Sequence, residues 1–184
     1  MAILIPDLPR FAQVQISQTG APWVHSPIFG GPDVRLSRIG AERFAVSVSC
    51  RGMSQDQGSA IVALVSRGMT EKLQLKLPQP GKTLASNGTV VSGSGMTLTV
   101  SGTAPKAGQY FNVTVGGVTY LHQVVTATAG SLIINPGLKA AVPGGTAVNF
   151  AAPVIEGFLV DNSLTYDFGL TGVLKLGFAI REAA

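Results

Sequence analysis

Apolar and polar residues alternate along most of this chain, and a period of two is the pattern of an extended strand with one buried face. Leu73, Leu75 and Leu77 are each separated by a single polar residue. The same alternation occurs at residues 96–100 and 111–115. Further strands are expected at residues 118–125, 132–134, 146–150, 156–160, 164–168 and 173–180. The chain is therefore predicted to be mainly β.

Glycine and proline punctuate these strands. Gly116 and Gly117 lie between two alternating runs, at the spacing of a two-residue turn that closes a β-hairpin. A second hairpin loop is expected around residues 93–95, and a β-turn at residues 161–163. Many short strands joined by such turns favour a β-sandwich or a barrel.

One helix is expected within this β pattern. Ser54 can act as its N-cap, and Gln57 follows at the spacing of a capping box. Apolar residues then recur at helical spacing until Arg67 and Gly68, so the helix covers roughly residues 54–67. Gly58 inside it costs about 1 kcal/mol relative to alanine, so the helix should depend on packing against a sheet.

The composition is unusually apolar for a free monomer. Charged residues make up 12% of the 184 residues, and the mean hydropathy is +0.37. No uninterrupted apolar run approaches the ~18 residues of a membrane span, and the N-terminus lacks the pattern of a signal peptide. We therefore expect a cytoplasmic site of synthesis, no membrane association, and spare apolar surface that contacts other protein.

The composition also changes along the chain in a way that predicts two domains. A run rich in Gly, Ser, Thr and Val follows Pro80 and ends near Pro153. The chain before and after this run has interleaved charges. We predict a discontinuous β-sandwich or split-barrel domain of residues 1–80 and 153–184, which carries the helix, and a small β-barrel inserted at residues 81–152.

The sequence offers little for catalysis. The nine acidic residues are scattered, and none lies between Glu71 and Glu156, so the inserted barrel has no carboxylate pair for glycoside hydrolysis. The Gly93-Ser94-Gly95 segment lacks the strand-to-helix turn of a nucleophilic serine. We expect no enzyme activity, and no catalytic, cofactor-binding or metal-binding residues.

The cysteine and the histidines are better explained as structural residues. Cys50 alternates in register with Phe44, Val46 and Val48, which is typical of a small buried side chain. His122 lies in an apolar strand and is expected to be buried and hydrogen-bonded. The net charge of +4 arises from dispersed residues, so no sequence-specific nucleic-acid binding is expected, and an acidic protein surface is the favoured type of partner.

Several segments together resemble the distal tail (baseplate ring) proteins of siphophages. Residues 36–44 and 75–81, around the expected helix, are similar to the N-terminal part of that family, and residues 165–183 to its closing hairpin. Many members of the family carry an inserted domain. Segments of this chain that resemble it are residues 96–102, 108–113, 120–125, 132–139 and 145–148. The sequence departs from the expected pattern at Tyr166, where such a hairpin would carry tryptophan.

This resemblance implies a structural virion protein at the tail tip, assembled in the host cytoplasm. Members of the family form a hexameric ring that holds the tail tube protein on one side and the tail-tip hub protein on the other. Tape measure or receptor-binding proteins are further expected partners. A tail tube or tail-completion protein is the alternative within the same structural class, and a carbohydrate-binding tail module for host adhesion is the alternative outside it.

Four aromatic residues are candidate contact residues. Trp23 and Phe29 lie in a stretch broken by proline, which indicates a loop, and an aromatic side chain on a loop can anchor an interface. Tyr110 and Tyr120 are of the type that stacks on sugar rings, with Gln109, Asn112 and Gln123 as nearby amides. Exposure of both tyrosines on one face would favour glycan binding.

Overall fold

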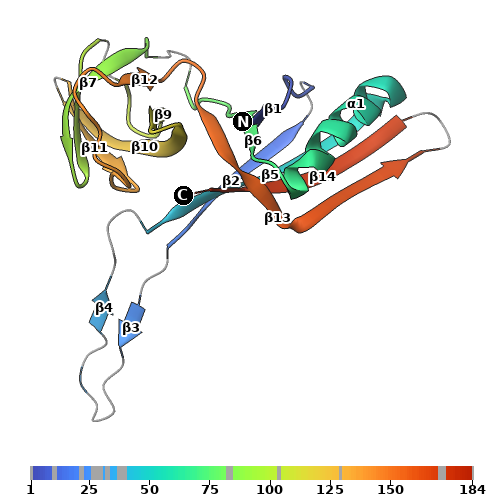
Figure 1. Cartoon of the computed structure of the whole chain (residues 1–184), viewed down its shortest axis with the longest axis horizontal. Helices are drawn as coiled ribbons and strands as arrows, with labels where there is room; N and C mark the ends of the chain where they lie inside the picture. The colour runs from blue at the N-terminus through green and yellow to red at the C-terminus, as the bar shows by residue number, and fades with distance from the viewer. Residues whose placement is uncertain are drawn as a thin grey trace.

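The computed structural model describes residues 2–9, 12–20, 23–25, 31, 34–36, 41–81, 85–102, 105–128, 130–169 and 173–183. These residues form a mainly β protein with one α-helix, a six-stranded open sheet, a closed six-stranded barrel and a separate two-stranded ribbon (Figure 1). The predicted fold class is confirmed.

The six-stranded sheet combines strands from both ends of the sequence. Its order is β1-β6-β13-β14-β5-β2, with every neighbouring pair antiparallel except β1 and β6. The strands are β1 (Ile3–Leu4), β2 (Gln13–Thr19), β5 (Arg43–Ser54), β6 (Leu73–Lys76), β13 (Val154–Phe168) and β14 (Val173–Glu182). The ribbon pairs β3 (Trp23–His25) with β4 (Val34–Leu36) and lies apart from the sheet in Figure 1.

One face of this sheet carries the larger core. Phe44, Val46, Val48 and Cys50 alternate along β5 and are all buried, as the sequence pattern predicts. Helix α1 (Gln55–Ser66) packs on this face against β5, β13 and β14. Gly58 makes that approach possible, because a Cβ at this position would lie 2.7 Å from the Leu174 side chain. The glycine that weakens the helix locally is thus the residue that lets it pack closely.

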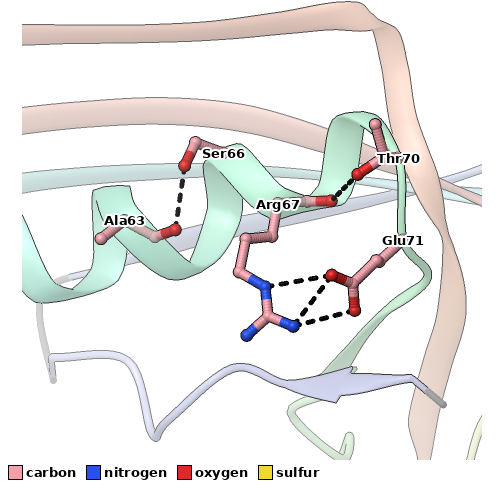
Figure 2. A network of polar contacts seen from close by, with 5 residues as sticks. All are labelled: Ala63, Ser66, Arg67, Thr70 and Glu71. Carbon is pink, nitrogen blue, oxygen red and sulfur yellow. Dashed lines mark hydrogen bonds and ion pairs between the residues drawn. The ribbon is translucent and has the colours of Figure 1, made fainter.

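The caps of α1 follow the sequence signals. Ser54 is the N-cap, and its side chain accepts a hydrogen bond from the Gln57 N–H. A 3-10 turn, η1 (Arg67–Met69), continues from the C-terminal end. There Arg67 forms a two-pronged ion pair with Glu71 at 2.8 and 2.9 Å (Figure 2). Ser66 Oγ donates to the Ala63 carbonyl (Figure 2), so the polar groups of this helix end are satisfied locally.

The barrel is formed entirely by the middle of the chain. Its strands close in the order β10-β11-β8-β7-β12-β9. They are β7 (Gly88–Ser94), β8 (Thr97–Val100), β9 (Tyr110–Val115), β10 (Val118–Thr128), β11 (Ser131–Asn135) and β12 (Ala147–Asn149). Gly116 and Gly117 form the predicted turn between β9 and β10, both with positive φ, as a type I′ hairpin requires. The division into domains of residues 1–80 with 153–184, and 81–152, as independently folding units, stays a prediction.

The predicted turn at residues 161–163 is wrong. The two strands expected on either side of it belong to one 15-residue strand, β13. Its pairing with β14 shifts register between Leu159 and Leu164, and Asp161 within this interval has a φ of 56°. From Leu159 to Leu164 β13 advances five positions while β14 advances two, so the polar residues lie in an irregular part of a continuous strand. Such an irregularity gives nearly the same sequence signal as a turn.

Candidate functional site

The most polar buried site lies where the barrel meets the sheet, and Glu182 is at its centre. The Glu182 side chain is fully buried at the end of β14. Its Oε1 accepts the Leu121 N–H of the barrel at 3.0 Å, and its Oε2 accepts the Phe44 N–H of β5 at 3.2 Å. Lys139, which follows β11 and is also buried, contributes its Nζ at 2.5 Å. One carboxylate therefore joins three segments that are distant in sequence.

Amide side chains add a second set of bonds across the junction. Gln79 donates to the carbonyls of Tyr110 and Phe150, at 2.5 and 2.6 Å, and accepts the Tyr110 N–H at 2.8 Å. Asn112 Oδ1, on β9, accepts the Val154 N–H of β13 at 3.1 Å. These bonds fix both points at which the chain passes between sheet and barrel.

Packing joins the two parts as well. Leu121 belongs to a barrel strand but is buried in the core of the sheet. Tyr110, also from the barrel, packs edge-on against Phe44 with ring centroids 5.9 Å apart. The barrel is therefore held against the sheet by a continuous apolar contact as well as by hydrogen bonds.

His122 is buried in the barrel, as the sequence predicts. Its ring stacks on Phe111, and Nδ1 donates to the Pro136 carbonyl at 2.9 Å. Burial lowers its pKa from 6.5 to about 4, although the bond to Pro136 acts in the opposite direction. Nε2 is buried without a hydrogen-bond partner, so protonation would add a buried donor that has no acceptor. The imidazole is neutral at pH 7 and has no access to a substrate.

Cys50 is buried in the sheet core, where desolvation raises the pKa of its thiol. A buried thiol with a raised pKa is a poor nucleophile. Within the described residues, no group of three His, Cys, Asp or Glu side chains is arranged to hold a metal ion. The described helix is too short to cross a bilayer, so no membrane-spanning helix is found in this part of the chain.

Glu156 lies on the opposite face of the sheet from the core, beside the barrel. It is nearly buried and accepts from Lys72 Nζ at 3.2 Å and from Gln74 Nε2 at 2.8 Å. These residues line a cleft of about 630 Å³ between the sheet and the β9–β10 hairpin, together with the exposed Phe158. Since Glu156 is paired with a cation and an amide, this carboxylate stabilises the cleft wall.

A second hollow, of about 400 Å³, shares Phe158 with this cleft. Its lining includes Arg43 from β5, Arg181 from β14 and Asp161 from β13. Phe158 and Arg181 are direct cross-strand neighbours, and Arg181 is in turn opposite Ala45 on β5. We call this site the arginine hollow, defined by Arg43, Phe158, Asp161 and Arg181. Sequence reasoning missed it because its members come from three strands and follow no local motif.

The predicted interface residues are placed only in part. Trp23 lies on the short strand β3, opposite Leu36 of β4. The expectation of a loop at this position is wrong, although the strand is not part of the six-stranded sheet. The Trp23 side chain and all of Phe29 lie outside the described residues. Their role as interface anchors stays a prediction.

The two tyrosines proposed for sugar stacking do not share one exposed face. Tyr110 packs against the sheet core, and burial raises the pKa of its phenol. Tyr120 packs against the separate core of the barrel and pairs with Val113. The two rings thus contribute to different cores, and their placement argues against the shared stacking platform that this alternative requires.

Large apolar side chains are instead exposed at positions that the sequence analysis does not name as contact residues. Tyr166 and Phe168, near the far end of β13, form an edge-to-face pair with ring centroids 5.5 Å apart. On the outside of the barrel the exposed apolar residues are Val91, Met96, Val125 and Ile133. Alternation did predict the strands, but it cannot tell which apolar face the fold leaves uncovered.

Comparison of the sequence with protein-family models and with curated proteins finds no match. The function is therefore argued from the geometry of this chain.

Proposed function

We propose that this chain is a ring-forming structural protein of a long-tailed bacteriophage, of the distal tail type, which joins the tail tube to the tail-tip hub. The observation that carries this proposal is the contrast between an open sheet and a closed barrel fixed to it. Among the described strands, the seven-residue edge strand β2 pairs with β5 alone. An unpaired strand edge can pair with a neighbouring chain.

The buried junction supports the same proposal. A subunit that closes a ring must present two different complementary surfaces at a fixed angle, because each copy contacts its two neighbours through different patches. Glu182, Gln79 and Asn112 tie barrel and sheet together by hydrogen bonds, which suits a rigid building block.

A tail tube or tail-completion protein would share the open sheet and the ring, so this alternative is retained. The inserted closed barrel favours the distal tail type, because it adds a projecting module to the ring-forming sheet. The tail tube protein, the hub protein and, further, tape measure or receptor-binding proteins are the proposed partners, and the virion tail tip the proposed location.

The test is the mass and shape of the purified full chain, by light scattering and negative-stain imaging at micromolar concentration. We expect closed rings of six subunits, or of twelve if two rings stack. The measurement is repeated with a tail tube protein added, because some ring proteins assemble only on their partner. A strict monomer under both conditions would contradict the proposal, and a monomer that bound glycans would favour the adhesion module.

A further inference from the structure

The far end of β13 carries exposed aromatic surface that nothing in the described structure covers. Tyr166 is 46% exposed and Phe168 55% exposed. They lie two residues apart, so they share one face of the strand, and their rings pack edge to face. Their cross-strand partners Leu176 and Leu174 are buried, so this pair extends the apolar face of the sheet into solvent.

Asp167 lies between these aromatics and points to the opposite face. It is exposed, and Lys175 lies across from it on β14. No ion pair of Asp167 is found with Lys175 or with any other described residue. We call Tyr166, Asp167 and Phe168 together the aromatic end of β13. It presents apolar surface on one side and, on the other, an exposed carboxylate that forms no ion pair with the described residues.

The arginine hollow offers complementary chemistry. Arg43 and Arg181 are both exposed, and neither has an ion-pair partner among the described residues. Phe158, 41% exposed, supplies an aromatic wall next to Arg181. Asp161 offsets one of the two positive charges, which leaves a net charge of about +1 in the hollow. Glu182 also borders it, but its carboxylate is held by Lys139.

One copy of the chain cannot bring these two surfaces together. Phe158 pairs with Arg181 and Asp167 with Lys175, so six positions of β14 separate them, which at ~3.3 Å per residue is roughly 20 Å. In Figure 1 the far end of β13 points away from the barrel, whereas the C-terminal end of β14, which carries Arg181, lies beside the barrel. The contact therefore requires two copies; repeated head to tail it closes a ring, whereas a reciprocal pair of such contacts would give a dimer only.

We propose that the aromatic end of β13 from one copy docks into the arginine hollow of the next copy. Because neighbouring residues of a strand point to opposite faces, an inserted strand end presents Tyr166 and Phe168 to one wall and Asp167 to the other. The aromatic pair packs on Phe158, and Asp167 pairs with Arg43 or Arg181. This inference rests on the proposed ring function and names the residues through which the ring closes.

The first test is a set of charge-reversal variants of the full chain. The quantity measured is the protein concentration at which half of the assemblies have dissociated. We expect Asp167→Arg to raise this concentration by about tenfold or more, and Arg43→Asp with Arg181→Asp to do the same. Combining all three changes restores the charge match and should recover most of the loss. Lys106→Asp, an exposed charge change on the barrel, is the matched control and should have no effect.

The second test traps the contact even if assembly is weak. A variant with Asp167→Cys and Arg181→Cys should form a ladder of disulfide-linked oligomers under oxidising conditions, since the native Cys50 is buried. The control pair Asp167→Cys and Lys106→Cys should stay at the background level. A ladder specific to the first pair supports the contact whether or not complete rings are seen.

Failure of this contact is distinguishable from failure of the ring function. Rings that form equally well with Asp167→Arg, or a charge match that gives no recovery, would overturn the contact and leave the ring function standing. Absence of both rings and specific cross-links in the full chain would overturn both.

Discussion

The barrel and the six-stranded sheet differ in how their strand edges are paired. Every strand of the barrel is paired on both sides, so no backbone edge is left for another chain. In the sheet, by contrast, β1 and β2 are each paired on one side only among the described strands. The sheet also carries Arg43 and Arg181, which form no ion pair with the described residues, and the exposed pair Tyr166 and Phe168. The difference supports the proposal that the sheet, whose edges are open, makes the contacts between copies, whereas the barrel leaves no strand edge for them.

The barrel and the sheet also differ in their acidic residues. No acidic residue lies between Glu71 and Glu156, so the barrel contains no carboxylate of its own. The carboxylate that neutralises its buried Lys139 is Glu182, from the last strand of the sheet. The barrel thus depends on the sheet for the partner of a buried charge, and this dependence can be tested by mutation.

The largest expected effect is at Glu182. Glu182→Ala leaves Lys139 buried without its anion and leaves the N–H groups of Phe44 and Leu121 without their acceptor. We expect the free energy of unfolding, measured by chemical denaturation, to fall by about 3–5 kcal/mol. Glu71→Ala, which breaks the exposed ion pair with Arg67, is the control and should cost less than about 1 kcal/mol. Equal effects of the two changes would refute the dependence of the barrel on the sheet.

His122 should make the stability of the barrel depend on pH. Its folded-state pKa of about 4 lies below the unfolded value of 6.5, so the unfolded state binds more protons between these values. The free energy of unfolding is therefore expected to fall by about 3 kcal/mol as the pH is lowered from 6.5 to 4.

The matched control is His122→Gln, which carries no titratable group. The pH dependence in this range should become flatter in the variant, even if its stability at pH 7 is lower. An unchanged slope between pH 6.5 and pH 4 would mean that other groups, and not the buried imidazole, set the acid sensitivity.

Gln79 tests whether barrel and sheet unfold together. Gln79→Ala removes the bonds to the Tyr110 N–H and to the carbonyls of Tyr110 and Phe150. We expect a loss of about 1–3 kcal/mol, and a calorimetric transition that broadens or splits because the barrel is less tightly coupled to the sheet. Gln13→Ala, on the exposed face of β2, should leave the transition single and unchanged. A single sharp transition in both variants would show that packing alone couples the two parts.

The smallest expected effect is at Ser54, the N-cap of the helix that packs on the sheet. Ser54→Ala removes the side-chain acceptor for the Gln57 N–H at the start of α1. We expect a loss of about 1 kcal/mol in the free energy of unfolding. Ser54→Asp, which keeps an acceptor at the N-cap, should retain most of the stability. A loss with the aspartate variant as large as with alanine would argue against the capping role.

Local features of the fold could be predicted because their causes are local. The Gly116-Gly117 turn and the Ser54 cap each depend on residues within a few positions of one another. The irregularity at Asp161 resembles a turn at the level of sequence, because polar residues interrupt the alternation in either case. The pairing across the irregularity decides between the two, and a single sequence does not contain that information.

The candidate site could not be predicted either, because it depends on contacts between segments that are far apart in the sequence. The partners of Glu182 lie 138, 61 and 43 positions away, and no spacing rule connects them. Tyr110 and Tyr120 are both polar-tipped aromatics in strands, but the fold directs one to each core. Tyr166 and Phe168 follow the alternation of buried residues and are nevertheless exposed, because nothing described covers that end of the sheet.

The central claim, that the sheet assembles and the barrel does not, is tested most directly by hydrogen–deuterium exchange on assembled and dissociated full-length protein. We expect assembly to slow exchange along β2, at the far end of β13 and around the arginine hollow, with little change in β8, β10 and β11 of the barrel. Protection that appears on the barrel strands, with β2 and β13 unchanged, would contradict the account.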